Sequence, residues 1–299
     1  AKQDMTVELS RINLKEFRRI LPYMPDMEGW IGAEAHYIDS GPYMMVSSDL
    51  RIDEFKYEGS ALGNWELGGV YLPGEAKDHH LDAYIRHDGE EIAHLGGIYL
   101  PAEEGTGSLS ADIAFEHFPL NVANPFVPDR MVELDGDIDG TLSMKGDPAK
   151  PLLNGELALD SVTFFMPEMS AMFRFDNEPV QVVNSKMMFK EFDIFTKGKT
   201  PFTINGEVDF SDLERTAVNL KMHAENYELL NAPRTKRAMV YGKMYVDFNA
   251  TLRGPVEELV MRGNMNILGK TNVTYVLKDS PLTVNDRLGD MVTFVNFDD

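Results

Sequence analysis

The chain has 299 residues, a formal net charge of −21 and no cysteine. That charge argues against nucleic-acid binding, which needs a basic face, and against electrostatic docking on anionic lipid headgroups. The missing cysteines exclude disulfides and thiolate metal sites, and no stretch approaches the ~18 apolar residues of a membrane-spanning helix.

The N-terminal residues predict a strand followed by the one clear helix of the chain. Residues 6–12 alternate between apolar and polar side chains, and Asn13 with Glu16 three positions later is a helix-start pattern. A helical stripe follows and ends at Pro22. We therefore predict a short helix near residues 13–21 that covers a sheet edge. The apolar positions of the stripe are Leu14, Phe17, Ile20 and Leu21.

The next hundred residues predict strands and contain an internal repeat. The sequence Leu-Gly-Gly-Val-Tyr-Leu-Pro at 67–73 returns as Leu-Gly-Gly-Ile-Tyr-Leu-Pro at 95–101. Between the two copies, Asp88 and Gly89 predict a tight hairpin turn. Four histidines surround this turn, and imidazoles are good zinc ligands. Because the hairpin register is undetermined, zinc ligation and simple exposure both stay open for His79, His80, His87 and His94.

The clearest alternation of the chain lies at residues 134–159. Leu134, Ile138, Leu142 and Met144 fall on one side, with acidic and polar residues between them. This period of two predicts a strand with one buried and one solvated face. Glycines recur on the apolar side here and in later strands, where glycine usually marks a bend or a close backbone approach. We therefore expect a sheet that curls toward its apolar face.

Repetition of this pattern to the end of the chain predicts an elongated array of strands. We divide the chain into a β-rich segment at residues 1–128 and a segment of repeated strands at 129–299, in one continuous sheet. The opening residues contain no signal peptide, and the last residues stop in strand-like sequence. We therefore expect a piece of a longer protein that does not itself span a membrane.

No motif in the sequence gives positive evidence for catalysis. Asp135, Asp137, Asp139 and Gly140 match the first half of a calcium loop, but the twelfth position is Gly146 instead of a bidentate glutamate. The solvated face of the strand accounts for these acids equally well. No nucleophile motif and no phosphate-binding loop is present, so we predict a protein that is not an enzyme and needs no cofactor.

Together these strands resemble the AsmA-like family, in particular its translocation and assembly module (TamB) members. The resemblance is carried by Gly-containing alternating strands and by the segment 241–282, and it covers the last two thirds of the chain best. The strands lie at residues 153–159, 204–210 and 261–267, and connectors such as Leu21-Pro22 and Leu229-Leu230-Asn231 add to it.

The resemblance implies an all-β fold, an elongated antiparallel sheet curled into a U-shaped trough with an apolar lining. It implies the periplasmic part of a protein anchored in the inner membrane of a diderm bacterium. Its partners would be phospholipid or other acyl chains and an outer-membrane β-barrel assembly protein. We expect lipid tails to lie on Leu134, Ile138, Leu142, Met144, Leu157, Leu159, Val208, Phe210, Met244, Val246, Phe248 and Leu252.

Three functions therefore compete at this stage. The first is a non-enzymatic conduit that carries phospholipid between the two membranes, which predicts an apolar trough open to solvent. The second is a scaffold or chaperone for outer-membrane protein assembly, which predicts a long bare edge strand. The third is a structural β-sandwich array, which predicts two sheets packed ~10 Å apart without a trough.

Overall fold

A computed structural model describes residues 3–41, 44–74, 78–102, 106–127, 132–167, 171–212, 215–234 and 239–276. Its strands form one 17-stranded sheet. The first half of the described chain contains β1 (Gln3–Asn13), α1 (Leu14–Ile20), β2 (Met27–Asp39), β3 (Met44–Tyr57), β4 (Ser60–Pro73), β5 (His79–His87), β6 (Glu90–Leu100), β7 (Ser108–Pro119), a 3-10 helix (Leu120–Phe126) and β8 (Glu133–Gly146).

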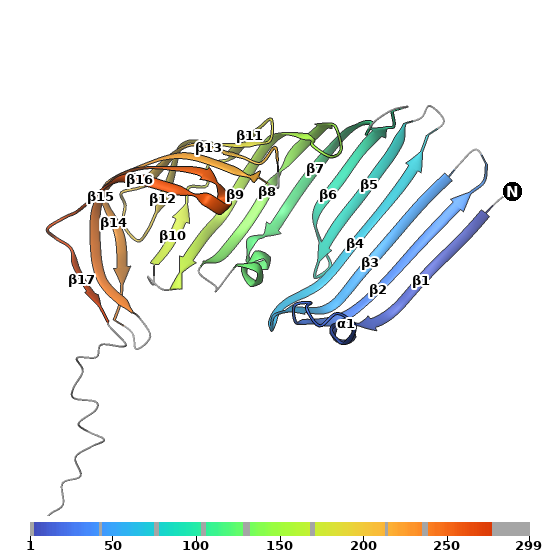
Figure 1. Ribbon diagram of the computed structural model, residues 1–299, viewed down its shortest axis with the longest axis horizontal. Helices are drawn as coiled ribbons and strands as arrows, with labels where there is room; N and C mark the ends of the chain where they lie inside the picture. The colour runs from blue at the N-terminus through green and yellow to red at the C-terminus, as the bar shows by residue number, and fades with distance from the viewer. Residues whose placement is uncertain are drawn as a thin grey trace, which may run out of the picture.

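The second half continues with strands that become shorter in places. It contains β9 (Leu152–Met166), β10 (Ala171–Phe175), β11 (Val180–Val183), β12 (Lys186–Phe195), β13 (Phe202–Asp209), β14 (Ala217–Ala232), β15 (Val240–Pro255), a 3-10 turn (Val256–Glu258), β16 (Val260–Ile267) and β17 (Asn272–Tyr275). Figure 1 shows these strands side by side in chain order along the molecule.

Every pairing in the sheet is antiparallel, and most strands pair with their neighbours in sequence. The short strands β10 and β11 both lie between β9 and β12, while β16 and β17 both pair with β15. The sheet is continuous where β7 pairs with β8, across the boundary at residue 128. The division into residues 1–128 and 129–299 stays a prediction.

The predicted helix is present as α1, from Leu14 to Ile20. The Asn13 side chain accepts a hydrogen bond from the backbone N–H of Lys15, and this satisfies one of the unpaired donors at the helix start. Glu16 pairs with Arg19 instead of returning to the cap. Among the described residues α1 is the one α-helix.

The hairpin between β5 and β6 turns at Asp88 and Gly89, as the sequence predicts. Both residues have positive φ angles, 49° and 92°, which are the backbone geometry of a two-residue hairpin turn. The two copies of the internal repeat lie on β4 and β6, the strands that flank β5. The two copies of the repeat therefore form equivalent segments of two strands of one sheet, on either side of β5.

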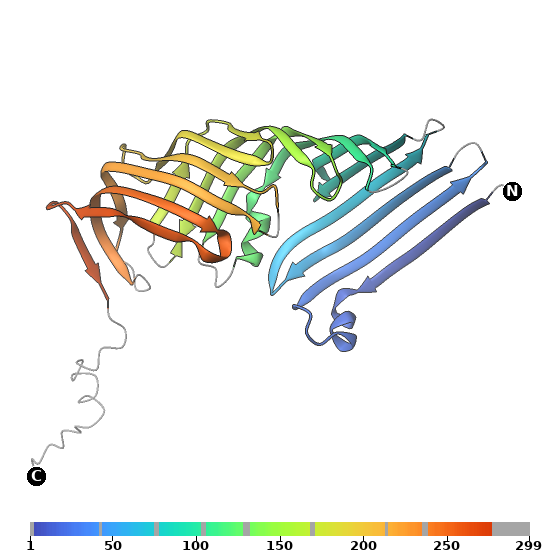
Figure 2. The same ribbon diagram turned by 45° about the horizontal axis from the view of Figure 1, so that its top comes forward.

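The sheet is curled, and the curl tightens toward the C-terminal strands. Phe164 on β9 and Phe248 on β15 line the same cavity, although β10 to β14 lie between their strands. Only a sheet that bends toward one face can bring these rings together. Figure 2 shows the bend: the C-terminal strands β14 to β17 lie in front of β9 and β10. The predicted curled antiparallel sheet is confirmed.

Candidate functional site

The inner face of the curl is a continuous apolar surface that every long strand helps to build. Residues that pair across antiparallel strands lie on the same face of a sheet, so the face can be followed from strand to strand. It passes from Leu142 on β8 through its partner Ile113 on β7 to Leu95 on β6. It continues through Leu67 on β4 to Leu50 on β3.

The C-terminal half of this face is packed into a core. Buried side chains from β10, β12, β14 and β15 form one cluster, with partly buried aromatic rings around it. Phe164 stacks on Phe173 with 4.5 Å between ring centroids, and Phe202 lies 5.8 Å from Phe248. Aromatic contacts at these distances stabilise a core beyond the area they bury.

A small cavity remains inside this core. Its volume is about 130 Å³, and its walls contribute no polar surface. For comparison, an apolar cavity of ~150 Å³ stays dry and takes up benzene. The cavity is therefore suited to a short stretch of hydrocarbon. It is lined by Phe164, Phe173, Ile194, Phe202, Tyr227, Leu229, Val246, Phe248 and Met265.

Among the described residues, the Tyr227 hydroxyl is the one buried side-chain polar group without a hydrogen-bond partner. Its side chain lines the cavity, but the cavity wall has no polar surface, so its hydroxyl does not open onto that space. Burial raises the pKa of this phenol. Tyr227 therefore contributes its ring to the lining and keeps its hydroxyl protonated.

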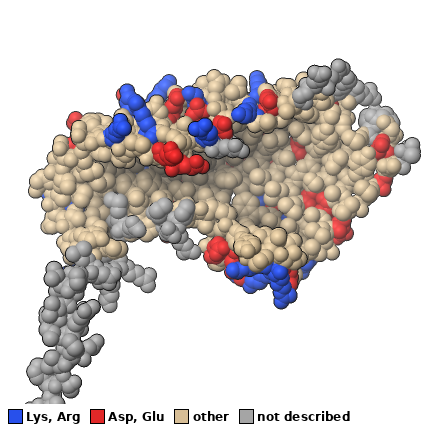
Figure 3. Space-filling model, in the orientation of Figure 1, with Lys and Arg blue, Asp and Glu red and all other residues tan. Residues whose placement is uncertain are grey.

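The N-terminal half of the same face is open to solvent. Met5, Val7 and Leu9 on β1 lie on the inner face and are exposed, as is Leu67 on β4. The apolar surface therefore changes from an open floor over β1 to β7 into a packed interior over β9 to β15. Figure 3 shows a hollow with an almost uncharged wall, and charged side chains gather along the rim above it.

Eleven of the twelve residues that the sequence placed in the apolar lining pair along this inner face. Leu134, Ile138, Leu142 and Met144 lie on β8. Leu157 and Leu159 lie on β9, opposite Gly140 and Ile138. Val208 lies on β13. The members on β15 are Met244, Val246, Phe248 and Leu252. Phe210 directly follows the last residue of β13. It is separated by an even number of positions from Val208, which faces inward.

The alternation missed several cavity residues, because bulges shift which residues face inward. Ser161 has a φ of 53° and lies at a bulge in β9. Because of this bulge, Phe164 faces the same side as Leu159, although an odd number of positions separates them. Asn226, with a φ of 51°, does the same for Tyr227. Asn tolerates this conformation better than most residues, so Asn226 was an available signal. Ser161 gives no comparable signal.

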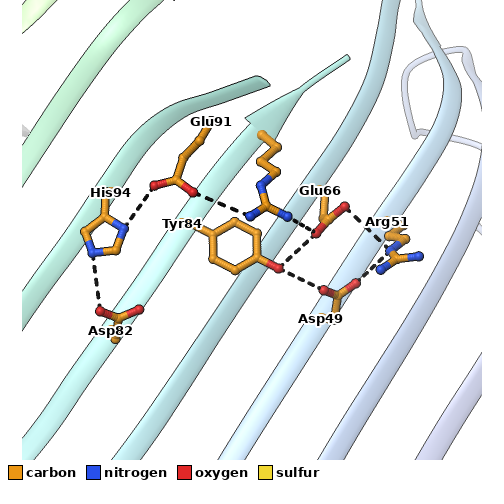
Figure 4. A network of polar contacts seen from close by, with 8 residues as sticks. Asp49, Arg51, Glu66, Asp82, Tyr84, Glu91 and His94 are labelled. Carbon is orange, nitrogen blue, oxygen red and sulfur yellow. Dashed lines mark hydrogen bonds and ion pairs between the residues drawn. The ribbon is translucent and has the colours of Figure 1, made fainter. Parts of the chain in front are cut away.

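On the outer face, a network of hydrogen bonds and ion pairs connects the strands from β3 to β6 (Figure 4). Tyr84 on β5 donates to Asp49 on β3 at 3.1 Å and to Glu66 on β4 at 2.9 Å. Arg86 contacts Glu66 at 3.1 Å and Glu91 on β6 at 3.6 Å. The hydrogen bonds to Glu66 and Asp49 and partial burial raise the pKa of Tyr84 to about 12.

The four histidines of the β5–β6 hairpin lie on both faces of the sheet. His79 faces inward, where its ring contacts Tyr71 and Tyr99, and His87 packs on Trp65. His94 faces outward and contacts Asp82 at 3.3 Å, while His80 contacts Asp78 at 3.4 Å. Since a pleated strand sends neighbouring side chains to opposite faces, the hairpin does not gather these rings together.

The three acids of the half calcium loop line the outer face of β8. Asp137 is opposite Asp160 of β9, and Asp139 contacts the His117 ring at 3.3 Å. Within the described ranges, no three His, Asp or Glu side chains are grouped closely enough to hold a metal ion.

A family comparison adds to this geometry. Residues 191–299 match the model of the TamB C-terminal domain. This match assigns residues 191–299 to the TamB family. TamB proteins are non-enzymatic envelope components with a role in outer-membrane protein assembly or lipid transport. Neither a curated protein nor a solved structure matches the chain.

The matched region begins within β12 and includes β13 to β17, which close the curl. The TamB segment therefore supplies one wall of the packed interior, including Val246 and Phe248. In the described part of the chain, no helix has the length and apolar character needed to cross a membrane.

Proposed function

We propose that this TamB chain is a conduit for phospholipid in the periplasm, part of a protein anchored in the inner membrane. Acyl chains lie on the inner face of the sheet, and headgroups stay in water at the open side. The conduit moves lipid between the inner and outer membranes without a catalytic step. The observation that carries this proposal is the mainly apolar inner face, open over β1 to β7 and packed over β9 to β15.

An exposed apolar face of this length needs a cover. A sheet usually buries its apolar face against a second layer. Among the described residues α1 is the one α-helix, and it lies at the end of β1. Acyl chains would cover the face at a gain of ~0.8 kcal/mol for each buried methylene. The lining residues named from the sequence, from Leu134 to Leu252, are proposed to contact these chains.

The form of the site also suits a transported ligand. The apolar floor over the N-terminal strands offers similar positions on successive strands, at Leu50 on β3, Leu67 on β4 and Leu95 on β6. A ligand held mainly by nondirectional apolar contact can slide along such a surface. An outer-membrane β-barrel assembly protein is the proposed partner at the end of the path, where the lipid leaves the chain.

Native mass spectrometry of the purified chain tests the proposal. We expect co-purified phospholipid with the wild type and its loss in Leu67→Asp, which puts a charge on the inner floor. Leu72→Asp is the matched control, because Leu72 lies on the same strand but the opposite face, and the two leucines are similarly exposed, 39% and 41%. A folded wild type without lipid, or equal loss in both variants, would overturn the proposal.

A further inference from the structure

The C-terminal edge of the sheet combines an exposed edge strand with three further features. The edge strand is β16, which pairs with β15 on one side. All eight of its residues are exposed, and no described strand pairs with its other side. An exposed edge presents unpaired N–H and C=O groups, which are a template for an added strand.

The first feature is an apolar row on the inner side of β16. Met261, Met265 and Ile267 continue the lining of the trough, because they pair with Leu252, Phe248 and Val246 of β15. Their exposed fractions are 58%, 51% and 63%, which is high for large apolar side chains. A strand added to this edge would bury the row if its inward residues were apolar.

The second feature is a basic outer side. Arg262 lies on the outer face, in one row with Thr251 of β15 and Lys221 of β14, and Arg253 lies in the next row. No described acidic group is within ion-pair distance of Lys221, Arg253 or Arg262. Basic side chains without an acidic neighbour are unusual in a chain with a net charge of −21.

The third feature is the shape of this outer side. A shallow hollow of about 620 Å³ lies over it, walled by Asn205, Lys221, His223, Asn249, Thr251 and Arg262. His223 and Asn249 are joined by a hydrogen bond of 2.6 Å. Cations and amides around a hollow favour carboxylates over neutral or basic groups.

We infer that β16 is a docking edge for an extended protein segment that alternates apolar and acidic residues. The partner strand extends the sheet by backbone hydrogen bonds. Its apolar residues cover Met261, Met265 and Ile267, and an acidic residue lies beside Arg262 at the ~4.8 Å spacing of paired strands. Arg262 then selects the partner, because a basic strand would place like charges side by side. This inference does not depend on lipid transport.

The chain itself contains a strand of the required pattern, which supplies a probe. On β1, Met5, Val7 and Leu9 face one side, and Asp4 and Glu8 face the other. A labelled peptide that copies residues 3–10 has this alternation. A second peptide with lysine at both acidic positions keeps the apolar side and reverses the charge.

Fluorescence polarisation with both peptides and the full chain tests the inference. We expect the acidic peptide to bind at least ~10-fold more tightly than the lysine peptide, and Arg262→Glu to reverse this order. Lys145→Glu is the control, since it makes the same charge change on the outer face of β8. Equal binding of both peptides, or an unchanged order in Arg262→Glu, would overturn the inference.

A disulfide experiment locates the peptide, which is possible because the chain has no cysteine. A peptide cysteine should cross-link to Asn264→Cys on β16 and not to Asn219→Cys on β14, which lies on the same face two strands inward. Cross-linking to both positions would contradict edge pairing. Self-association of the wild type that Arg262→Glu abolishes would assign the edge to a second copy of the chain and overturn a separate partner.

Discussion

Phe164 of β9 and Phe248 of β15 both line one apolar cavity, although the strands β10 to β14 separate them in the sheet. Their convergence is the geometric signature of the curl. It turns a sheet with one apolar face into a trough whose C-terminal part is closed.

The packed interior should be sensitive to loss of volume. Leu230 on β14 is 1% exposed and belongs to the core cluster. We expect Leu230→Ala to lower the free energy of unfolding by about 2–5 kcal/mol, because it removes buried methyl groups and leaves a void. Urea unfolding followed by circular dichroism measures the change. Leu72→Ala on the outer face should cost less than about 1 kcal/mol, and equal losses in both variants would contradict the described core.

Several strand glycines have positive φ angles and lie close to the backbone of the neighbouring strand. Gly206 on β13 has a φ of 137°, and a Cβ atom there would lie 2.1 Å from the backbone oxygen of Asn219. We expect Gly206→Ala to destabilise the fold by several kcal/mol, since backbone strain and a backbone clash add together. Gly146→Ala separates the two effects, because Gly146 has a φ of 101° but no neighbour within 4 Å. Thermal unfolding should show the smaller loss for Gly146→Ala.

The outer network should lose its stabilising effect at high pH. Its hydrogen bonds to Asp49 and Glu66 require a protonated Tyr84, whose pKa is raised to about 12 in the folded state from an ordinary value of ~10. A raised folded-state pKa means that the contribution is complete below pH ~10 and is lost as the pH rises through about 12.

The size of this effect is limited by solvent, because the network lies on a partly exposed face. We expect a contribution of at most about 1 kcal/mol. Urea unfolding at pH 9 and pH 12 measures it, with Tyr84→Phe as the reference that cannot ionise at this position. If the difference in stability between wild type and Tyr84→Phe stays constant over this range, Tyr84 does not hold the network together.

Much of the fold is predictable from alternation. The strand expected at Leu134 is β8, and the hairpin at Asp88 is present because a local residue pair determines a local turn. The inner row of β8 follows directly from a period of two. These features are determined by residues that are close together in the sequence, so a short segment is enough to predict them.

The cavity is less predictable because its residues depend on bulges and on contacts between distant strands. A bulge at Ser161 reverses the facing of every later residue of β9, and nothing in the sequence around it marks the reversal. Phe173 and Met265 enter the same cavity from strands that are far apart in the chain. Their meeting follows from the degree of curl, which no single strand encodes.

The central claim is that lipid occupies the inner face along the open strands, and site-specific photocrosslinking in cells tests it most directly. A photoreactive phenylalanine analogue at Leu67, and separately at Leu95, would report contacts of the inner face; the same analogue at Leu72 would report the outer face of β4. The account predicts phospholipid adducts, identified by mass spectrometry, at Leu67 and Leu95 and none at Leu72. Adducts at all three positions, or protein adducts alone at Leu67 and Leu95, would contradict it.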